Sequence, residues 1–215
     1  MKMGSIYAIG DIHGCYDKLL KLMEKILKLY DPVKDTLVFL GDYIDRGPDS
    51  FLVTEYLIGL KRQFPGIVFL RGNHEEMLGQ YLLGLDRSCY LANGGRQTLE
   101  SYMAHNPGRG MQTVPRDHLH FYSSLSLYYT SEEYIFVHAG IREKIPLEDQ
   151  TSEDLLWIRS HFVRSTYNFG KQVVFGHTPF AEPLVQTNKI GIDTGAVYGN
   201  RLTCVKLPEM EFYQA

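Results

Sequence analysis

Five short apolar segments of this chain each lead into polar residues of the types that bind metal ions. In chain order these polar residues are Asp11 with His13, Asp42, Asn73, His138 and His177. Carboxylate, amide and imidazole groups without cysteine make an oxygen and nitrogen ligand set, which suits Mn, Fe or Zn better than copper. The set is too large for one ion. We therefore expect two divalent cations, Mn²⁺ first and Fe or Zn as alternatives, with Asp42 bridging them because two cations need a shared anion.

The elements that must position these residues begin with a predicted parallel sheet. Apolar, β-branched runs at residues 5–9, 36–40 and 67–70 alternate with amphipathic helical patterns at 17–30 and 51–60. This βαβαβ order brings the carboxyl ends of all three strands to one edge of the sheet, where ligands bind in open α/β folds. The polar residues after these strands are therefore expected to meet.

The second half of the chain is richer in short strands. Residues 128–129 and 134–137 flank a polar turn and predict an antiparallel hairpin. Further short strands are predicted at 173–175, 184–186, 190–192, 202–207 and 211–213. These strands predict a second, mixed sheet. We expect a single domain over residues 1–215, with a helical and irregular, cap-like section at about 76–125.

Composition limits the classes of partner. The chain has 22 Lys and Arg against 25 Asp and Glu, a net charge of −3, so no global positive field attracts nucleic acid or an anionic membrane. Its 3 cysteines form no CxxC motif and fit a reducing compartment. With no visible secretion signal or membrane span, we expect a cytoplasmic protein. The oligomeric state is left open.

Five sequence blocks carry a resemblance to a known family. GDIHG, GDYIDRG, RGNHE, VHAG and GHT, in this order, resemble the metal-dependent phosphoprotein phosphatases of the calcineurin-like metallophosphoesterase superfamily, above all the compact bacterial and bacteriophage members. The stretches NGGRQTLESY and GIDTGAVYGNRLT also look like those of bacterial relatives that include the symmetrical dinucleoside tetraphosphatases. The resemblance implies an α/β fold in which a β-sandwich of two mixed sheets is flanked by helices, in four layers αββα.

The resemblance also implies how the metal ligands are shared out. Asp11 and His13 would hold one ion and Asp42 would bridge both. The second ion would be held by Asn73, His138 and His177. A hydroxide between the ions would then attack phosphorus in line.

Other residues of the blocks are implied in proton transfer and phosphate binding. His74 would donate a proton to the leaving oxygen, and Asp45 would orient its imidazole. Arg46 would clamp phosphate oxygens. Arg159 is the candidate for a second phosphate-binding arginine, with Arg164 as the alternative.

Several residues keep two interpretations. Arg71 and Glu75 are expected to pair with one another or to hold their loop. Asp193 and Tyr198 either line the site or shape a turn. His118 is expected to be a surface or cap residue.

Three functions follow from this pattern. The first is hydrolysis of phosphoserine or phosphothreonine in proteins, with phosphotyrosine left open, because Asp45 is typical of protein phosphatases and usually absent from the tetraphosphatases. The alternative is hydrolysis of a dinucleoside polyphosphate of the Ap4A type, or of another nucleotide, at the same centre. A non-catalytic binding protein is disfavoured because no ligand is missing. The expected partner is thus a phosphorylated protein or another phosphate ester.

Overall fold

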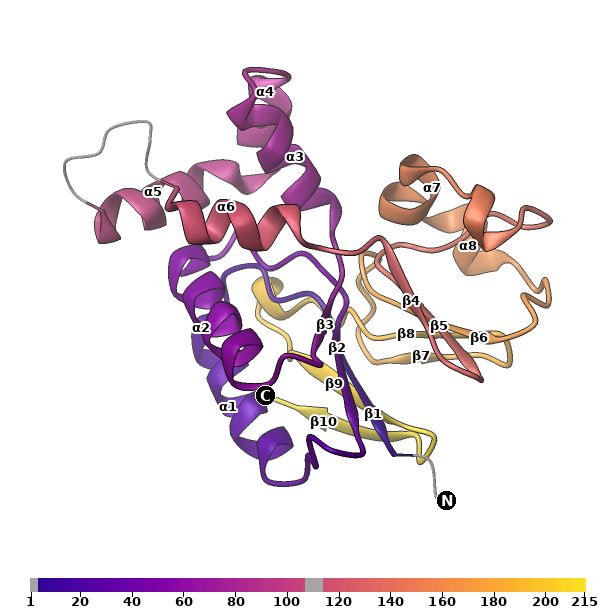
Figure 1. The fold of residues 1–215 in the computed structure, drawn as a ribbon. Coiled ribbons are helices and arrows are strands. Elements are labelled where there is room, and N and C mark those ends of the chain that lie inside the picture. Colours follow the sequence, from indigo (N-terminus) through magenta and orange to yellow (C-terminus); the bar gives the residue numbers. More distant parts are fainter. Residues whose placement is uncertain (1–3, 107–113) are drawn as a thin grey trace.

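The computed structural model describes residues 4–106 and 114–215 and contains two five-stranded sheets (Figure 1). The strand order is β10-β9-β1-β2-β3 in the first sheet and β4-β5-β6-β8-β7 in the second. The first sheet contains β1 (Ile6–Ile9), β2 (Thr36–Phe39), β3 (Val68–Phe69), β9 (Thr203–Leu207) and β10 (Glu211–Gln214). The second contains β4 (Tyr128–Thr130), β5 (Tyr134–Val137), β6 (Gln172–Phe175), β7 (Leu184–Val185) and β8 (Lys189–Gly191).

Both sheets are mixed, as the family resemblance implies; the strand pattern predicted a parallel first sheet and did not place β9 in it. β1, β2 and β3 pair in parallel, and β9 pairs with the other side of β1 in the antiparallel sense. In the second sheet β5, β6 and β8 are parallel, while β4 and β7 are antiparallel edge strands. The parallel strands of each sheet therefore end at a common edge.

Helices flank the two sheets. Two longer ones, α1 (Tyr16–Leu27) and α2 (Ser50–Gln63), lie beside the first sheet, and α7 (Ser152–Trp157) and α8 (Ser160–Arg164) lie beside the second (Figure 1). In α1 the apolar residues at helical spacing form the buried face. Lys21 and Lys25 lie on the solvated side of the same helix. Two short 3₁₀ turns, Leu147–Asp149 and η3 (Ala196–Tyr198), complete this part of the fold.

Alternating strand residues build three apolar layers. Ile9 and Phe39 face α1 and α2, whereas their neighbours Ala8 and Val38 face the second sheet. On the far side of the second sheet, Phe175 packs with α7 and α8. Because the side-chain period of a strand is two, each sheet separates two cores. The four-layer αββα arrangement predicted from the resemblance is confirmed.

The section predicted at about 76–125 is helical in the part the structure describes. It holds most of α3 (Asn73–Leu82), then α4 (Arg87–Tyr90), the π-helical turn η1 (Leu91–Gly95), α5 (Arg96–His105) and α6 (Arg116–Ser123). Residues 107–113 lie outside the described part. Within residues 4–106 and 114–215, no helix is long and apolar enough to cross a membrane.

Candidate metal centre

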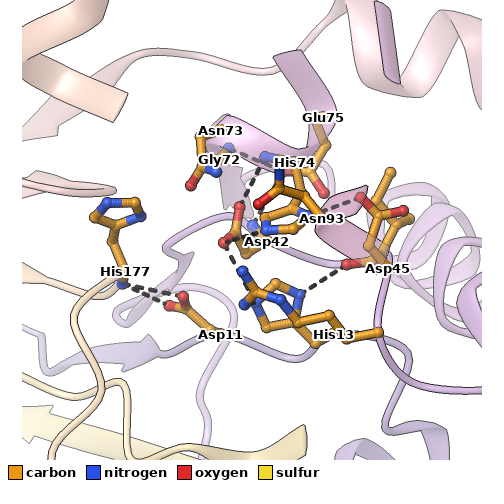
Figure 2. Close-up of polar contacts among 12 residues, drawn as sticks. Asp11, His13, Asp42, Asp45, Gly72, Asn73, His74, Glu75, Asn93 and His177 are labelled. Atoms are coloured by element: carbon orange, nitrogen blue, oxygen red, sulfur yellow. Dashed lines mark hydrogen bonds and ion pairs between the residues drawn. The ribbon is translucent and has the colours of Figure 1, made fainter. Parts of the chain in front are cut away.

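The polar residues that follow the strands come together in one place. Figure 2 shows Asp11, His13, Asp42, Asn73 and His177 of this set. Two clusters of possible metal ligands share Asp42. Within each cluster the potential ligand atoms lie within 4.8 Å of one another. One contains His13 and His74, and the other contains His138 and His177. The first sheet and the second thus contribute to a single buried site.

Asp42 lies in the middle of this site and contacts most of its other members. Its carboxylate oxygens lie 3.4 Å from Nε2 of His13 and 3.4 Å from Nε2 of His138, and accept the backbone N–H of His74 at 3.1 Å. Oδ1 of Asn73 lies 3.0 Å from Nε2 of the same His138. Asp42 therefore occupies the place expected of a bridging ligand.

Asp11 joins the site from its other side. Its carboxylate accepts the backbone N–H of His177 at 3.0 and 3.2 Å, as Figure 2 shows. Asp11 belongs to neither of the two clusters around Asp42. The structure thus brings the six predicted ligands into one site. Which of them hold which ion stays a prediction.

The histidines turn one ring nitrogen toward the centre. Nδ1 of His13 lies 2.8 Å from the carbonyl oxygen of Ile44, and Nδ1 of His138 lies 2.9 Å from that of Leu40. A carbonyl only accepts, so Nδ1 carries a hydrogen and Nε2 is the nitrogen that would bind a cation, as in many metal sites. In this structure Nε2 contacts Arg46 in His13, and Asn73 and Asp42 in His138. Nε2 of His177 is buried and has no hydrogen-bond partner among the described residues. A metal ligand role fits this orphaned nitrogen.

The electrostatics of the site also fit cations. Burial lowers the pKa of His13 to about 3 and that of His177 to about 2, so both rings are neutral, as metal ligands must be. Burial raises the pKa of Asp193 to about 6, and burial together with the charge of Asp193 raises that of Asp11 well above its usual value. Burial would also raise the pKa of Asp42, but the neighbouring imidazoles hold it well below its usual range. Bound divalent cations would offset the cost of keeping these buried carboxylates in their charged form.

Backbone strain is concentrated in the same residues. Among the described residues other than glycine, eight have a positive φ, and five of these are predicted site residues. They are His13 at 46°, Asp42 at 51°, Asp45 at 73°, Arg46 at 66° and His177 at 62°. Such conformations cost about 1–3 kcal/mol each and collect at functional sites.

His74 and Asp45 form a buried dyad beside the centre. Nδ1 of His74 donates to Oδ2 of Asp45 at 2.7 Å, and both side chains are fully buried. Nε2 of His74 has no partner in the described part of the chain and lies 3.9 Å from Asp42. The pair is thus arranged as expected for a proton donor and its orienting carboxylate.

Sequence reasoning missed two residues that hold this dyad. The second oxygen of Asp45 accepts from the hydroxyl of Tyr90 at 2.9 Å and from that of Thr98 at 2.5 Å. Tyr90 ends α4 and Thr98 lies in α5, so the helical section supplies both groups. The stretch NGGRQTLESY was singled out in the sequence, but nothing in it indicated a contact with Asp45.

Glu75 holds the loops of the site. Its carboxylate accepts the backbone N–H groups of Asp42, Tyr43 and Gly72 at 3.0, 2.8 and 2.9 Å. Arg71 pairs instead with Glu76 at 3.1 Å. The loop-holding interpretation of Glu75 is confirmed, and its pairing with Arg71 is wrong.

The predicted arginines lie on two sides of the centre. Arg46 is half-buried, with one guanidinium nitrogen 2.6 Å from Nε2 of His13. Arg159 follows α7 on the surface, and its charge adds to burial in lowering the pKa of His177. Arg164 ends α8 and is exposed. Trp157, two residues before Arg159, has its ring centroid 6.4 Å from that of His177. This placement favours Arg159 over Arg164.

Comparison with known proteins decides the family. The family model of calcineurin-like phosphoesterases matches residues 4–203. The chain belongs to this family. The phosphoesterase is 30% identical to "bis(5'-nucleosyl)-tetraphosphatase PrpE [asymmetrical]" of Geobacillus sp. (strain WCH70), over 94% of this chain and 90% of that protein. The calcineurin-like superfamily predicted from the five blocks is confirmed, whereas its phosphoprotein phosphatase branch stays a prediction. The name of this relative gives asymmetrical cleavage, unlike the symmetrical tetraphosphatases that the sequence resembles.

Solved structures agree on the fold of the phosphoesterase. A protein assigned as a diadenosine tetraphosphatase superposes with a TM-score of 0.75 at 24% identity, over 100% of this chain and 94% of that one. A cold-active protein tyrosine phosphatase superposes with a TM-score of 0.70 at 18% identity, over 99% of this chain and 78% of that one. These likenesses establish the fold of the chain.

Proposed function

We propose that this phosphoesterase hydrolyses dinucleoside tetraphosphates at a centre of two divalent cations. The observation that carries the reaction class is Asp42, one buried carboxylate shared by two histidine clusters. The substrate class rests on the relative from Geobacillus, whose name gives asymmetrical cleavage and which is similar over nearly its full length. For diadenosine tetraphosphate we therefore expect ATP and AMP as products.

The ligand set defines what the chain would do around the cations. Asp11 and His13 would hold one ion, Asp42 would touch both, and Asn73, His138 and His177 would hold the other. Bound there, the cations would neutralise the phosphoryl oxygens and activate the attacking water. Mn²⁺ is the first expectation because imidazole nitrogens disfavour Mg²⁺, with Fe or Zn as alternatives.

Side chains around the ions would bind the phosphoryl group and supply a proton to the leaving oxygen. Arg46 and Arg159 would bind phosphoryl oxygens from two sides through charge-assisted hydrogen bonds. His74 would protonate the leaving oxygen from Nε2, while Asp45 keeps the ring oriented through Nδ1. Tyr90 and Thr98 would fix Asp45 in turn.

The His74–Asp45 dyad supports a second candidate, hydrolysis of phosphoserine or phosphothreonine in proteins. A serine alkoxide is a far more basic leaving group than a nucleoside phosphate, so it depends more on a proton donor. The dyad is fully buried and well hydrogen-bonded. This is the feature expected of a phosphomonoesterase.

One experiment separates the two candidates. The protein is stripped with a chelator, reloaded with Mn²⁺, Fe²⁺, Zn²⁺ or Mg²⁺, and assayed on diadenosine tetraphosphate and on a phosphoseryl peptide. We expect activity to disappear on chelation and kcat/KM to favour the dinucleotide by tenfold or more, about 1.4 kcal/mol. A preference for the peptide would reverse the order of the candidates, and full activity after exhaustive chelation would refute the metal centre.

A further inference from the structure

An exposed tyrosine stands at the rim of the metal centre. Tyr198 ends the short helix η3 and is 65% exposed. Its ring centroid lies 5.8 Å from Cζ of Arg46, whose guanidinium reaches Nε2 of His13 at 2.6 Å. The ring is therefore one arginine side chain away from the ligands of the centre.

The turn that carries Tyr198 is held in place from several sides. Lys18 of α1 donates to the carbonyl oxygens of Ala196, at 2.7 Å, and of Asn200. The side chain of Asn200 donates to the carbonyl oxygen of Ala181 at 2.9 Å. These hydrogen bonds fix the backbone on both sides of the tyrosine. The ring itself is exposed to solvent and is not part of an apolar core.

Charge alone offers little to distinguish a nucleotide from another phosphate here. The metal ions and Arg46 and Arg159 would bind any phosphoryl group. Lys18, a basic side chain close to the Tyr198 turn, is used on backbone carbonyls. Recognition of the nucleoside thus requires an uncharged contact near the phosphate site.

We propose that Tyr198 is the platform on which a nucleobase of the substrate stacks while the attached phosphate contacts Arg46. The inference rests on the proposed function, because it names how the nucleotide is held at that site. An exposed aromatic ring stacks on any base through its face, and a tyrosine on a fixed backbone has few bonds left to order on binding. The guanidinium of Arg46 packs near the same ring, so base and phosphate sites are adjacent.

The test compares two ligands that differ only in the base. Binding of AMP and of ribose 5-phosphate to the Mn²⁺-loaded protein is measured by isothermal titration calorimetry. We expect the wild type to bind AMP more tightly, and Tyr198→Leu to weaken AMP binding about tenfold while ribose 5-phosphate binding is unchanged. Tyr198→Phe should keep the preference. Tyr167→Leu is the matched control, an exposed tyrosine before the start of β6, at the opposite end from the site.

Each other outcome is informative. An equal loss of both ligands in Tyr198→Leu would mean that the ring only holds Arg46, and would overturn the inference. A wild type that does not distinguish the two ligands would overturn it as well. Dinucleotide turnover with the same kcat/KM in wild type and Tyr198→Leu would refute the platform alone. Base-dependent AMP binding without dinucleotide hydrolysis would refute the proposed function and leave the platform standing.

Discussion

A methyl group added at Gly72 should disable the centre through Asp42. A Cβ at Gly72 would lie 2.1 Å from Oδ1 of Asp42, 2.4 Å from its backbone nitrogen and 2.8 Å from Oε2 of Glu75. The backbone itself tolerates alanine, because φ of Gly72 is −95°. The effect of Gly72→Ala is therefore the contact and nothing else.

The geometry sets the size of the effect. Ordinary contact begins at 3.4 Å, so Oδ1 of Asp42, 2.1 Å from the added Cβ, must retreat by about 1.3 Å, and the Asp42 backbone nitrogen, at 2.4 Å, by about 1 Å. A misplacement of about 1 Å can reduce the rate about 10²-fold, which corresponds to about 2.7 kcal/mol. Because Asp42 is shared by both clusters, we also expect weaker binding of both cations.

The assay combines kcat/KM on diadenosine tetraphosphate, metal affinity by calorimetry and a thermal melt without metal. Gly79→Ala is the control, in the helix that Gly72 precedes, since no atom outside the helix backbone lies within 4 Å of its added Cβ. It should keep full activity and gain about 0.5–1 kcal/mol of stability. Gly176→Ala, whose Cβ would lie 2.1 Å from Oδ1 of Asp11, should repeat the loss from the other side. Wild-type activity and metal affinity in Gly72→Ala would refute the bridging role of Asp42.

Three further predictions concern the groups around the centre. Tyr90→Phe should lower kcat about tenfold on alkyl phosphates and less on aryl phosphates, because it loosens Asp45 and with it the proton donor; equal losses on both substrates would contradict this role. Arg159→Ala should raise the inhibition constant of inorganic phosphate about tenfold, whereas Arg164→Ala should not, and the opposite result would exchange the two arginines. Asp154→Asn should destabilise the protein by about 1–2 kcal/mol at pH 7, measured by urea unfolding, since Asp154 forms the capping box of α7. Burial alone would raise the pKa of Asp154, but hydrogen bonds from arginine and threonine hold it below its usual value, so this stabilisation is lost as the pH falls through that lowered pKa. A difference that persists once Asp154 is protonated in the folded protein would argue against this charge effect.

Short-range pattern made much of the site predictable. Asp11, Asp42 and Asn73 each follow an apolar run, and parallel strands bring their ends to one edge. His138 and His177 repeat this pattern in the second half of the chain. The strand pattern predicted a parallel first sheet and a mixed second sheet, while two mixed sheets in four layers were implied by the family resemblance.

The contacts that depend on packing between distant segments were not predictable. Tyr90 and Thr98 reach Asp45 across 45 and 53 residues of sequence, and no local pattern marks them. His118, expected at the surface or in the cap section, is fully buried in α6, where it contacts Tyr102 at 2.6 Å. Which face of such a helix turns inward is decided by the neighbour it packs against, and in this case that neighbour is α2.

The pairing of β9 with β1 has a consequence for the synthesis of the protein. Tyr7 and Ala8 acquire their partners on this side of the sheet only when Lys206 and Val205 have left the ribosome. His177 also emerges late, so a nascent chain carries the early aspartates long before the imidazoles that complete the cluster. The proposed ligand set is therefore complete only once His177 has emerged, and a chain that stalls before β9 would leave the β1 edge of its first sheet unpaired.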